Sequence, residues 1–415
     1  MAINVLGLRE ALSLKFEPKW FELVRGFERR GAIKKMRLVA PTYVGVTGSC
    51  GKTTTASLLG EVLKKGYHHK LQLGVANNQE RYAYRSLRKM PADTQTVVQE
   101  LHGGEAGGLD YLVEHIPVDV AIITAIGREH VKAFSEIEAI AREKAKLITA
   151  LVPGGVACLN IDSEPVAHLA KECRPDVKCL TVSATQDADF RAEIVTSNWK
   201  ERLCFTLKFG GRAYKVKTRF VGTIALTNVL LVLAAIHSMG LDLEPALSVI
   251  SQFEPVDSRM NLLRANNGQY FLMDCFKASL WSAKMLAQDL PNIKSGPLVF
   301  VLGQLSETGS GGSVRYRQYI KSIEQHCDII IGTSGALSSV QKRQDMDPSG
   351  KFFACETIGE IASEIAKHQD ALVVLKSSKI AKLSRVVEAI KAPITCQIKH
   401  CPMVTGCNTC PMLRA

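Results

Sequence analysis

A short glycine-containing loop near the start of the chain has the residue types that hold phosphate. The loop reads Gly48-Ser49-Cys50-Gly51-Lys52-Thr53-Thr54. Small residues let backbone N–H groups approach an anion, a lysine neutralises phosphate charge, and a hydroxyl can ligate Mg²⁺. Val46 replaces the first glycine of the strict phosphate-loop pattern. A simple glycine turn before a helix is the alternative, and phosphate binding is the preferred interpretation.

The predicted elements around this loop are those that a phosphate site requires. Residues 43–46 form a β-rich run before it, and residues 56–65 have helical periodicity after it. A loop between a strand and a helix places backbone N–H groups at a helix N-terminus, where anions bind. Further strands are predicted at 96–100, 118–126 and 156–160, with helices between them. This alternation predicts an α/β fold with a mostly parallel sheet covered on both faces.

The second half of the chain repeats the alternation after a change of pattern. Residues 191–220 alternate like antiparallel strands, a long helix is predicted from about Leu226 to Met239, and residues 253–258 form a linker. The strands predicted beyond the linker are 270–274, 298–303, 329–332 and 371–376. A second, smaller α/β domain is therefore expected.

Three blocks resemble motifs of the Mur ligase family. Residues 44–55 are similar to the family's nucleotide loop, with Cys50 in place of the usual asparagine. The block from Ile126 to Lys144 resembles the segment around the family's metal-ligating histidine and modified lysine. Asp274 to Ser282, followed by Val301-Leu302-Gly303 and Lys376-Ser377-Ser378-Lys379, is similar to its C-terminal domain. The resemblance extends over about residues 41–391.

The resemblance implies a domain organisation. It predicts a helical N-terminal segment (1–40), a central P-loop ATP-binding domain (41–255), a smaller Rossmann-like α/β C-terminal domain (256–393) and a cysteine-rich tail (394–415). Family members that grip a UDP-sugar carry a substantial domain before the loop, and about forty residues precede it here. We therefore expect a carboxylate substrate other than a UDP-muramoyl peptide, or a second subunit that binds it.

The resemblance also implies an activity, an ADP-forming joining of an acid to an amine. ATP would phosphorylate a carboxylate, and the amine would attack the acyl phosphate, a reaction that depends on positioning and charge neutralisation. Lys52 would hold the β- and γ-phosphates, and Lys376 would face the acyl phosphate. Thr53, Glu100 and His130 would ligate Mg²⁺. By their residue types alone, Glu100 could also be a surface carboxylate at a strand end, and His130 a core or surface histidine.

Four further positions match family residues around the nucleotide. Lys144 matches a lysine that many Mur ligases carry as a metal-binding carbamate; otherwise it is one of three cations on a solvated helix face. Asn228 matches an adenine-contacting asparagine, and Arg259 an arginine that reaches ATP when the C-terminal domain closes. Asp274 matches an aspartate that contacts the ribose or the hinge.

Departures from the family pattern leave other functions open. Ala125, Ile224 and Ala225 replace polar family residues, and residues 276–280 replace most of a Tyr-Asn-Ala-Asn-Pro run. A non-catalytic, nucleotide-binding scaffold or regulatory subunit is the first alternative, and a simple NTP-hydrolysing switch the second. ADP release that depends on both an acid and an amine would separate the ligase from the scaffold.

The net charge of +12 admits several anionic partners. No basic stripe with interleaved aromatic residues indicates nucleic acid. The basic cluster within residues 25–37 is interpreted as a solvated helix face or a docking surface for a protein partner. No segment has the length and apolarity of a membrane span, and no secretory signal is visible, so a cytoplasmic location is expected.

Four cysteines are concentrated in the last twenty residues. Cys396, Cys401, Cys407 and Cys410 have the spacing C-x₄-C-x₅-C-x₂-C. Closely spaced thiolates in a reducing compartment can bind zinc or an iron–sulfur cluster, although this spacing is no standard one. The alternative is a tail with free thiols, which could also contact a protein partner.

Overall fold

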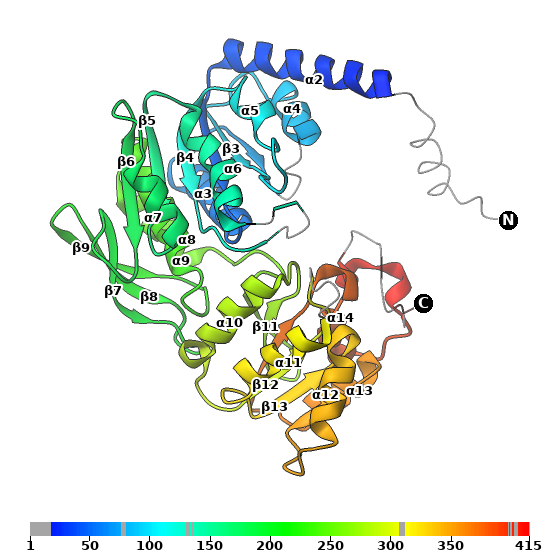
Figure 1. The fold of residues 1–415 in the computed structure, drawn as a ribbon. Helices are drawn as coiled ribbons and strands as arrows, with labels where there is room; N and C mark the ends of the chain where they lie inside the picture. Colours follow the sequence, from blue (N-terminus) through cyan, green and yellow to red (C-terminus); the bar gives the residue numbers. More distant parts are fainter. Residues whose placement is uncertain are drawn as a thin grey trace.

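The computed structural model describes residues 18–75, 80–129, 133–134, 136–306, 312–396, 398, 401 and 406–414. Its two β-sheets occupy the upper and lower halves of the molecule (Figure 1). The first sheet has the order β2-β3-β1-β4-β5-β6-β7-β8-β9. Its strands are β1 (Thr42–Thr47), β2 (Leu71–Gly74), β3 (Thr96–Glu100), β4 (Val118–Ile123), β5 (Leu151–Asn160), β6 (Lys178–Ser183), β7 (Phe190–Thr196), β8 (Cys204–Phe209) and β9 (Arg212–Lys217).

The first sheet is parallel from β2 to β7 and antiparallel from β7 to β9. Strands β1 and β3 are buried almost throughout because helices cover both faces. One face packs against α3 (Lys52–Gly66), α8 (Leu226–Ser238) and α9 (Leu243–Gln252). The other face packs against α2 (Pro18–Val39), α4 (Glu80–Arg88), α5 (Asp110–Val113), α6 (Ile137–Thr149) and α7 (Glu164–Lys171).

The second sheet has the order β10-β11-β15-β12-β13-β14, and it is parallel except for the β10–β11 pair. Its strands are β10 (Asn261–Arg264), β11 (Tyr270–Asp274), β12 (Leu298–Leu302), β13 (Ile329–Gly332), β14 (Phe352–Ala354) and β15 (Leu372–Lys376). Helices α10 (Leu280–Ile293), α11 (Gly312–Ile323) and α12 (Leu337–Gln344) cover one face. Helices α13 (Ile358–Ile365) and α14 (Arg385–Lys391) cover the other.

The predicted α/β fold class is confirmed, and the differences are local. Strands β2, β6, β10 and β14 were not predicted, because each is short or only partly apolar in sequence. Helix α3 begins at Lys52, within the phosphate loop, and β4 ends at Ile123. The antiparallel prediction for 191–220 is confirmed by β7 to β9, which extend the parallel sheet. None of the helices described is both long enough and apolar enough to cross a bilayer.

Candidate active site

The phosphate loop joins β1 to α3, and two of its glycines have backbone angles that other residues rarely adopt. Gly48 has a φ of 143°, and Gly51, which caps α3, has a φ of 87°. A Cβ atom at Gly48 would lie 2.0 Å from Thr124 Oγ1, and one at Gly51 would lie 2.3 Å from Asn228 Oδ1. Both positions therefore require glycine, and Asn228 on α8 packs directly against the loop.

A hydroxyl and a carboxylate meet at the start of α3. The Thr53 hydroxyl donates to Glu100 Oε2 at 2.8 Å, and both side chains are buried. Glu100 is the last residue of β3, and it lies beside Val46 in the parallel register of β1 and β3. The carboxyl ends of neighbouring parallel strands meet at one edge of a sheet, where ligands bind in open α/β folds. The hydroxyl oxygen of Thr53 and the carboxylate oxygens of Glu100 are the kind of ligand that Mg²⁺ prefers.

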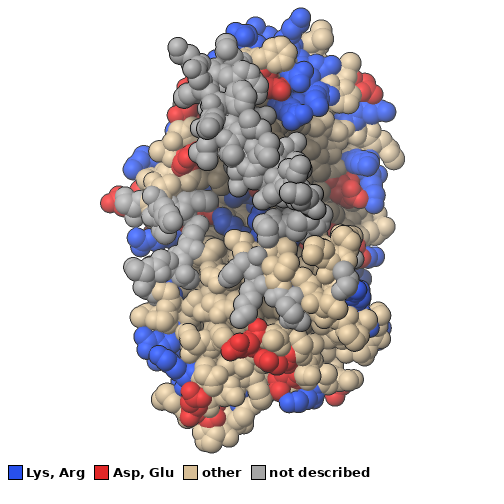
Figure 2. Space-filling view, turned by 90° about the vertical axis from the view of Figure 1, so that its right-hand side faces the viewer, with Lys and Arg blue, Asp and Glu red and all other residues tan. Residues whose placement is uncertain are grey.

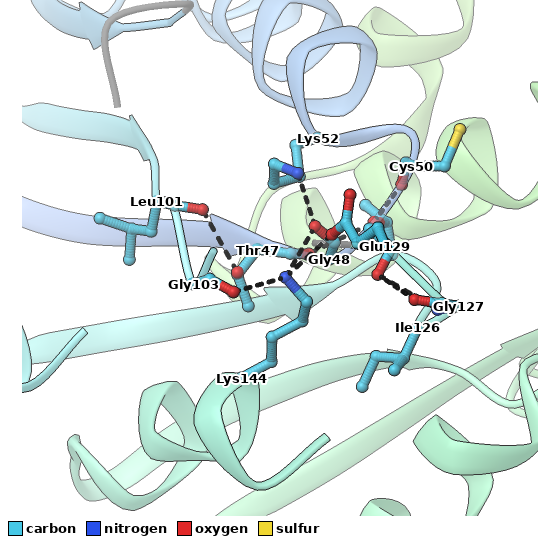
Figure 3. A network of polar contacts seen from close by, with 12 residues as sticks. Thr47, Gly48, Cys50, Lys52, Leu101, Gly103, Ile126, Gly127, Glu129 and Lys144 are labelled. Atoms are coloured by element: carbon cyan, nitrogen blue, oxygen red, sulfur yellow. Dashed lines mark hydrogen bonds and ion pairs between the residues drawn. The ribbon is translucent and has the colours of Figure 1, made fainter. Parts of the chain in front are cut away.

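Three lysines surround the buried carboxylate of Glu129. Lys144 Nζ lies 3.4 Å from Glu129 Oε1, and Lys277 Nζ forms an ion pair with Glu129 Oε2. Lys52 and Lys144 both donate to the carbonyl oxygen of Gly48, at 2.6 and 3.1 Å (Figure 3). Lys144 also donates to the Gly103 carbonyl at 3.4 Å. The amines of α3 and α6 therefore converge on the phosphate loop.

Burial and mutual repulsion change the proton affinity of this cluster. Burial lowers the pKa of Lys52, against the attraction of Glu129. Burial, followed by repulsion from Lys52, lowers the pKa of Lys144 to about 7. Burial alone would raise the pKa of Glu129, but attraction by Lys52, Lys144 and Lys277 outweighs it and holds that pKa far below its ordinary value. Near neutral pH the cluster thus holds an ionised carboxylate and a partly neutral lysine amine.

The second sheet contributes cations to the same site. Asp274 and Lys376 end β11 and β15 and are paired in register, and their side chains form an ion pair. Lys376 is fully buried and also donates to the Lys277 carbonyl at 3.2 Å. The guanidinium carbon of Arg259 lies 4.0 Å from the centroid of the Phe276 ring, which fixes the arginine by a cation–π contact.

A pocket of about 300 Å³ lies between the two sheets, and both halves line it. Its lining includes the whole loop from Ser49 to Thr54, with Glu100, Asn228, Arg259, Asp274, Lys277 and Lys376. Ile224 and Ala225, two of the departures from the Mur ligase motifs noted in the sequence, also line it. The pocket is therefore cationic where it meets the loop and partly apolar beside α8.

The structure brings nearly all the predicted site residues together. Glu100 is buried, so its interpretation as a surface carboxylate is wrong. Lys144 is 1% exposed, so the solvated-face interpretation is wrong as well. His130 lies outside the described residues. Sequence reasoning gave no role to Glu129 and counted Lys277 only as a departure from the family pattern. The signal available in the sequence was that Glu129 and Lys277 are both charged and both lie within blocks that resemble Mur ligase motifs.

The predicted tail metal site is not supported. Among the residues that the structure describes, which include all four tail cysteines, no group of three or more His, Cys, Asp or Glu side chains could hold a metal ion. The four thiols are free. Cys396 Sγ instead lies 3.5 Å from Nη1 of Arg385, the first residue of α14.

Comparisons with known proteins agree with this geometry. Residues 46–236 match the model of the Mur ligase middle domain. The UDP-N-acetylmuramoyl-tripeptide--D-alanyl-D-alanine ligase of Mycobacterium tuberculosis is 26% identical over 86% of this chain and 74% of its own length. The enzyme of the same name from Bacillus subtilis is 26% identical over 85% and 76%.

Solved structures show the same fold. MurF ligase from Thermotoga maritima in complex with ADP has a TM-score of 0.77 at 19% identity, over 89% of this chain and 84% of that one. MurF from Acinetobacter baumannii has a TM-score of 0.78 at 22% identity, over 88% and 80%. Residues 46–236 are therefore similar in sequence to the Mur ligase middle domain, and the chain shares the fold of solved Mur ligases over most of its length.

Proposed function

We propose that this protein is an ATP-dependent ligase that activates a carboxylate as an acyl phosphate and joins it to an amine. The observation that carries the proposal is the pocket in which a phosphate loop from the first sheet faces Lys376 and Arg259 of the second half. Phosphoryl transfer needs little covalent help from a protein and much charge neutralisation and alignment, and this pocket supplies both. The similar enzymes named above are ligases.

The loop residues would bind the triphosphate. Lys52 donates to the Gly48 carbonyl here, and it would exchange that contact for phosphate oxygens, which are stronger acceptors. Thr53 and Glu100 fit a Mg²⁺ ion because their oxygens lie 2.8 Å apart at the mouth of the loop. When bound there, Mg²⁺ would neutralise the charge of the phosphates. His130 is proposed as a further ligand on the motif alone.

The second half of the chain would act on the acyl phosphate. Lys376 and Lys277 line the pocket opposite the loop, where a carboxylate would approach the γ-phosphate. Their charges would reduce the repulsion between the two anions and stabilise the oxyanion that forms when the amine attacks. Arg259, stacked on Phe276, would contact the nucleotide from the same side.

Lys144 is proposed to act as a carbamate, formed when its neutral amine adds to carbon dioxide and releases a proton. A pKa of about 7 makes that amine available near neutral pH. The product anion would lie near Lys52 and Lys277, whose positive charges would offset those of the carbamate and of the neighbouring Glu129 carboxylate. Trapping the adduct with ¹³C-labelled carbon dioxide and observing its carbonyl resonance would test this, with Lys144→Met as the control.

The activity is tested by ADP and phosphate release from the full chain. We expect turnover that needs a carboxylate and an amine together, and a panel can start with the acid and dipeptide named for the similar enzymes. A non-catalytic scaffold would bind nucleotide and release no ADP with any pair. An NTP-hydrolysing switch would release ADP without either substrate, and its turnover would survive Lys144→Met.

A further inference from the structure

The outermost helix of the first half, α2, carries an unusual combination of charge and exposed apolar side chains. Residues 18–39 contain seven Lys or Arg against two Glu, and residues 80–89, which include α4, contain four against one. These two segments therefore account for eight of the twelve net positive charges of the chain. Lysine and arginine side chains gather at the top of Figure 2, the end of the molecule where α2 and α4 lie in Figure 1.

The exposed face of α2 alternates basic and apolar residues. Arg30, Lys34 and Arg37 are exposed, and Phe27 and Leu38 on the same side of the helix are 61% and 74% exposed. Phe27, Arg30, Lys34 and Leu38 are spaced by three or four residues, so they form one stripe along the helix. Ala32 and Met36, on the opposite side, are buried against the first half. The outer face of α2 therefore carries apolar side chains within a stripe of basic ones, in addition to the apolar side chains that hold the helix to the first half.

Helix α4 extends this surface. The Arg88 side chain reaches across to α2, where it pairs with Glu28 and lies 5.5 Å from the centroid of the Phe27 ring. Tyr82 and Arg85 of α4, and Lys89 just after it, are also exposed, on the side of α4 next to β2. Arg30, Lys34 and Arg37 pair with none of the acidic side chains that the structure describes. Their charge is therefore available to an external anion.

We propose that the outer face of α2 and α4 binds the surface of a bilayer that contains anionic phospholipids. An acidic protein would also match the charge. It would not by itself explain why two large apolar side chains, Leu38 and Phe27, are both mostly exposed about 16 Å apart along the same face. Basic side chains flanking apolar ones are typical of helices that lie in a membrane interface, where lysines and arginines meet headgroups and apolar groups enter the acyl boundary. The nucleotide pocket lies between the two sheets and leaves this face free.

Flotation of the full chain with vesicles tests the proposal. We expect binding to phosphatidylcholine vesicles that contain phosphatidylglycerol, weaker binding at high salt, and little binding to phosphatidylcholine alone. Each Lys or Arg near an anionic membrane contributes about a five-fold change in affinity, so Arg30→Glu/Lys34→Glu/Arg37→Glu should weaken binding by about 100-fold or more. Phe27→Ser/Leu38→Ser should weaken binding and leave the salt dependence in place.

The matched control reverses three exposed charges elsewhere, Arg212→Glu/Lys215→Glu/Lys217→Glu on β9. This variant has the same net charge as the α2 variant and should still bind vesicles. Equal loss in both variants would overturn the proposal, because it would show a response to net charge alone. Failure of the wild type to bind anionic vesicles, together with retention on immobilised poly-glutamate, would overturn it in favour of an acidic protein. Nucleotide affinity, which this face does not touch, checks that each variant is folded.

Discussion

The buried amine of Lys144 should make the stability of this protein rise with pH, and replacing it with methionine should remove that rise. Lys144 is 1% exposed, and burial together with repulsion from Lys52 lowers its pKa from 10.5 to about 7, against the attraction of Glu129. Between about pH 7 and 10.5, the unfolded chain therefore keeps a proton that the folded chain has released. Stability increases with pH wherever the unfolded state binds more protons.

The size of the effect follows from the two pKa values. Half of the folded molecules are protonated at Lys144 near pH 7, and almost none are protonated at pH 9, whereas nearly all unfolded molecules still hold the proton. Each pH unit across this window contributes about 1.4 kcal/mol, so the wild type should gain about 2 kcal/mol relative to Lys144→Met between pH 7 and 9. Below about pH 6 the difference should be constant, because both states are then protonated.

Chemical denaturation of the wild type and of Lys144→Met at pH 6, 7, 8 and 9 measures the difference between their free energies of unfolding. The contributions of other titrating groups largely cancel in this difference, because both proteins contain them. Lys146→Met is the matched control, because Lys146 lies on the same helix, is partly exposed and pairs with Asp110 and Glu143, which raises its pKa. That variant should show no gain for the wild type between pH 7 and 9. A difference between the wild type and Lys144→Met that stays flat over the same range would refute the reasoning.

Three further predictions concern Lys277, Glu100 and Asp289. Lys277→Met should raise the pKa of Lys144, because Lys277 repels its ammonium form, and should move the onset of the stability rise above pH 7; an unchanged onset would disprove the coupling. Glu100→Gln should raise the Mg²⁺ concentration needed for half-maximal ATP binding by about ten-fold, as measured by titration, since one charged ligand is lost; an unchanged requirement would remove Glu100 from the metal site. Asp289 is buried and accepts hydrogen bonds from Thr223 N and Oγ1, at 2.7 Å each, and from Ile224 N at 3.2 Å. Asp289→Ala should therefore lower the free energy of unfolding by about 3 kcal/mol, and a loss no larger than that of an exposed Asp370→Ala control would contradict this.

The phosphate loop could be read from the sequence because its signal is local. Glycines, Lys52 and Thr53 lie within seven residues, between a strand and a helix whose periodicities are visible. The partner of Thr53 required the fold, because Glu100 reaches it only through the position of β3 next to β1. A carboxylate at a strand end looks the same in sequence whether that end faces solvent or a ligand.

Burial was the property that the sequence did not reveal. Lys144 lies between Arg142 and Lys146 on α6, and three cations in five residues are also typical of a solvated face. Only the packing of α6 beneath the loop distinguishes Lys144 from its neighbours. Lys277 is a further example. In the sequence it is only a lysine where the Mur ligase motif has asparagine, and its ion pair with Glu129 depends on how the two halves of the molecule lie together.

Calorimetric titration of Mg²⁺–ATP into the full chain, beside Lys52→Met, measures the property on which the proposed function depends most directly. We predict saturable binding by the wild type and affinity lower by about 10- to 100-fold in the variant, because charge-assisted contacts to the phosphates are lost. Absence of binding by the wild type, or equal affinity in the two proteins, would contradict a nucleotide site at this loop.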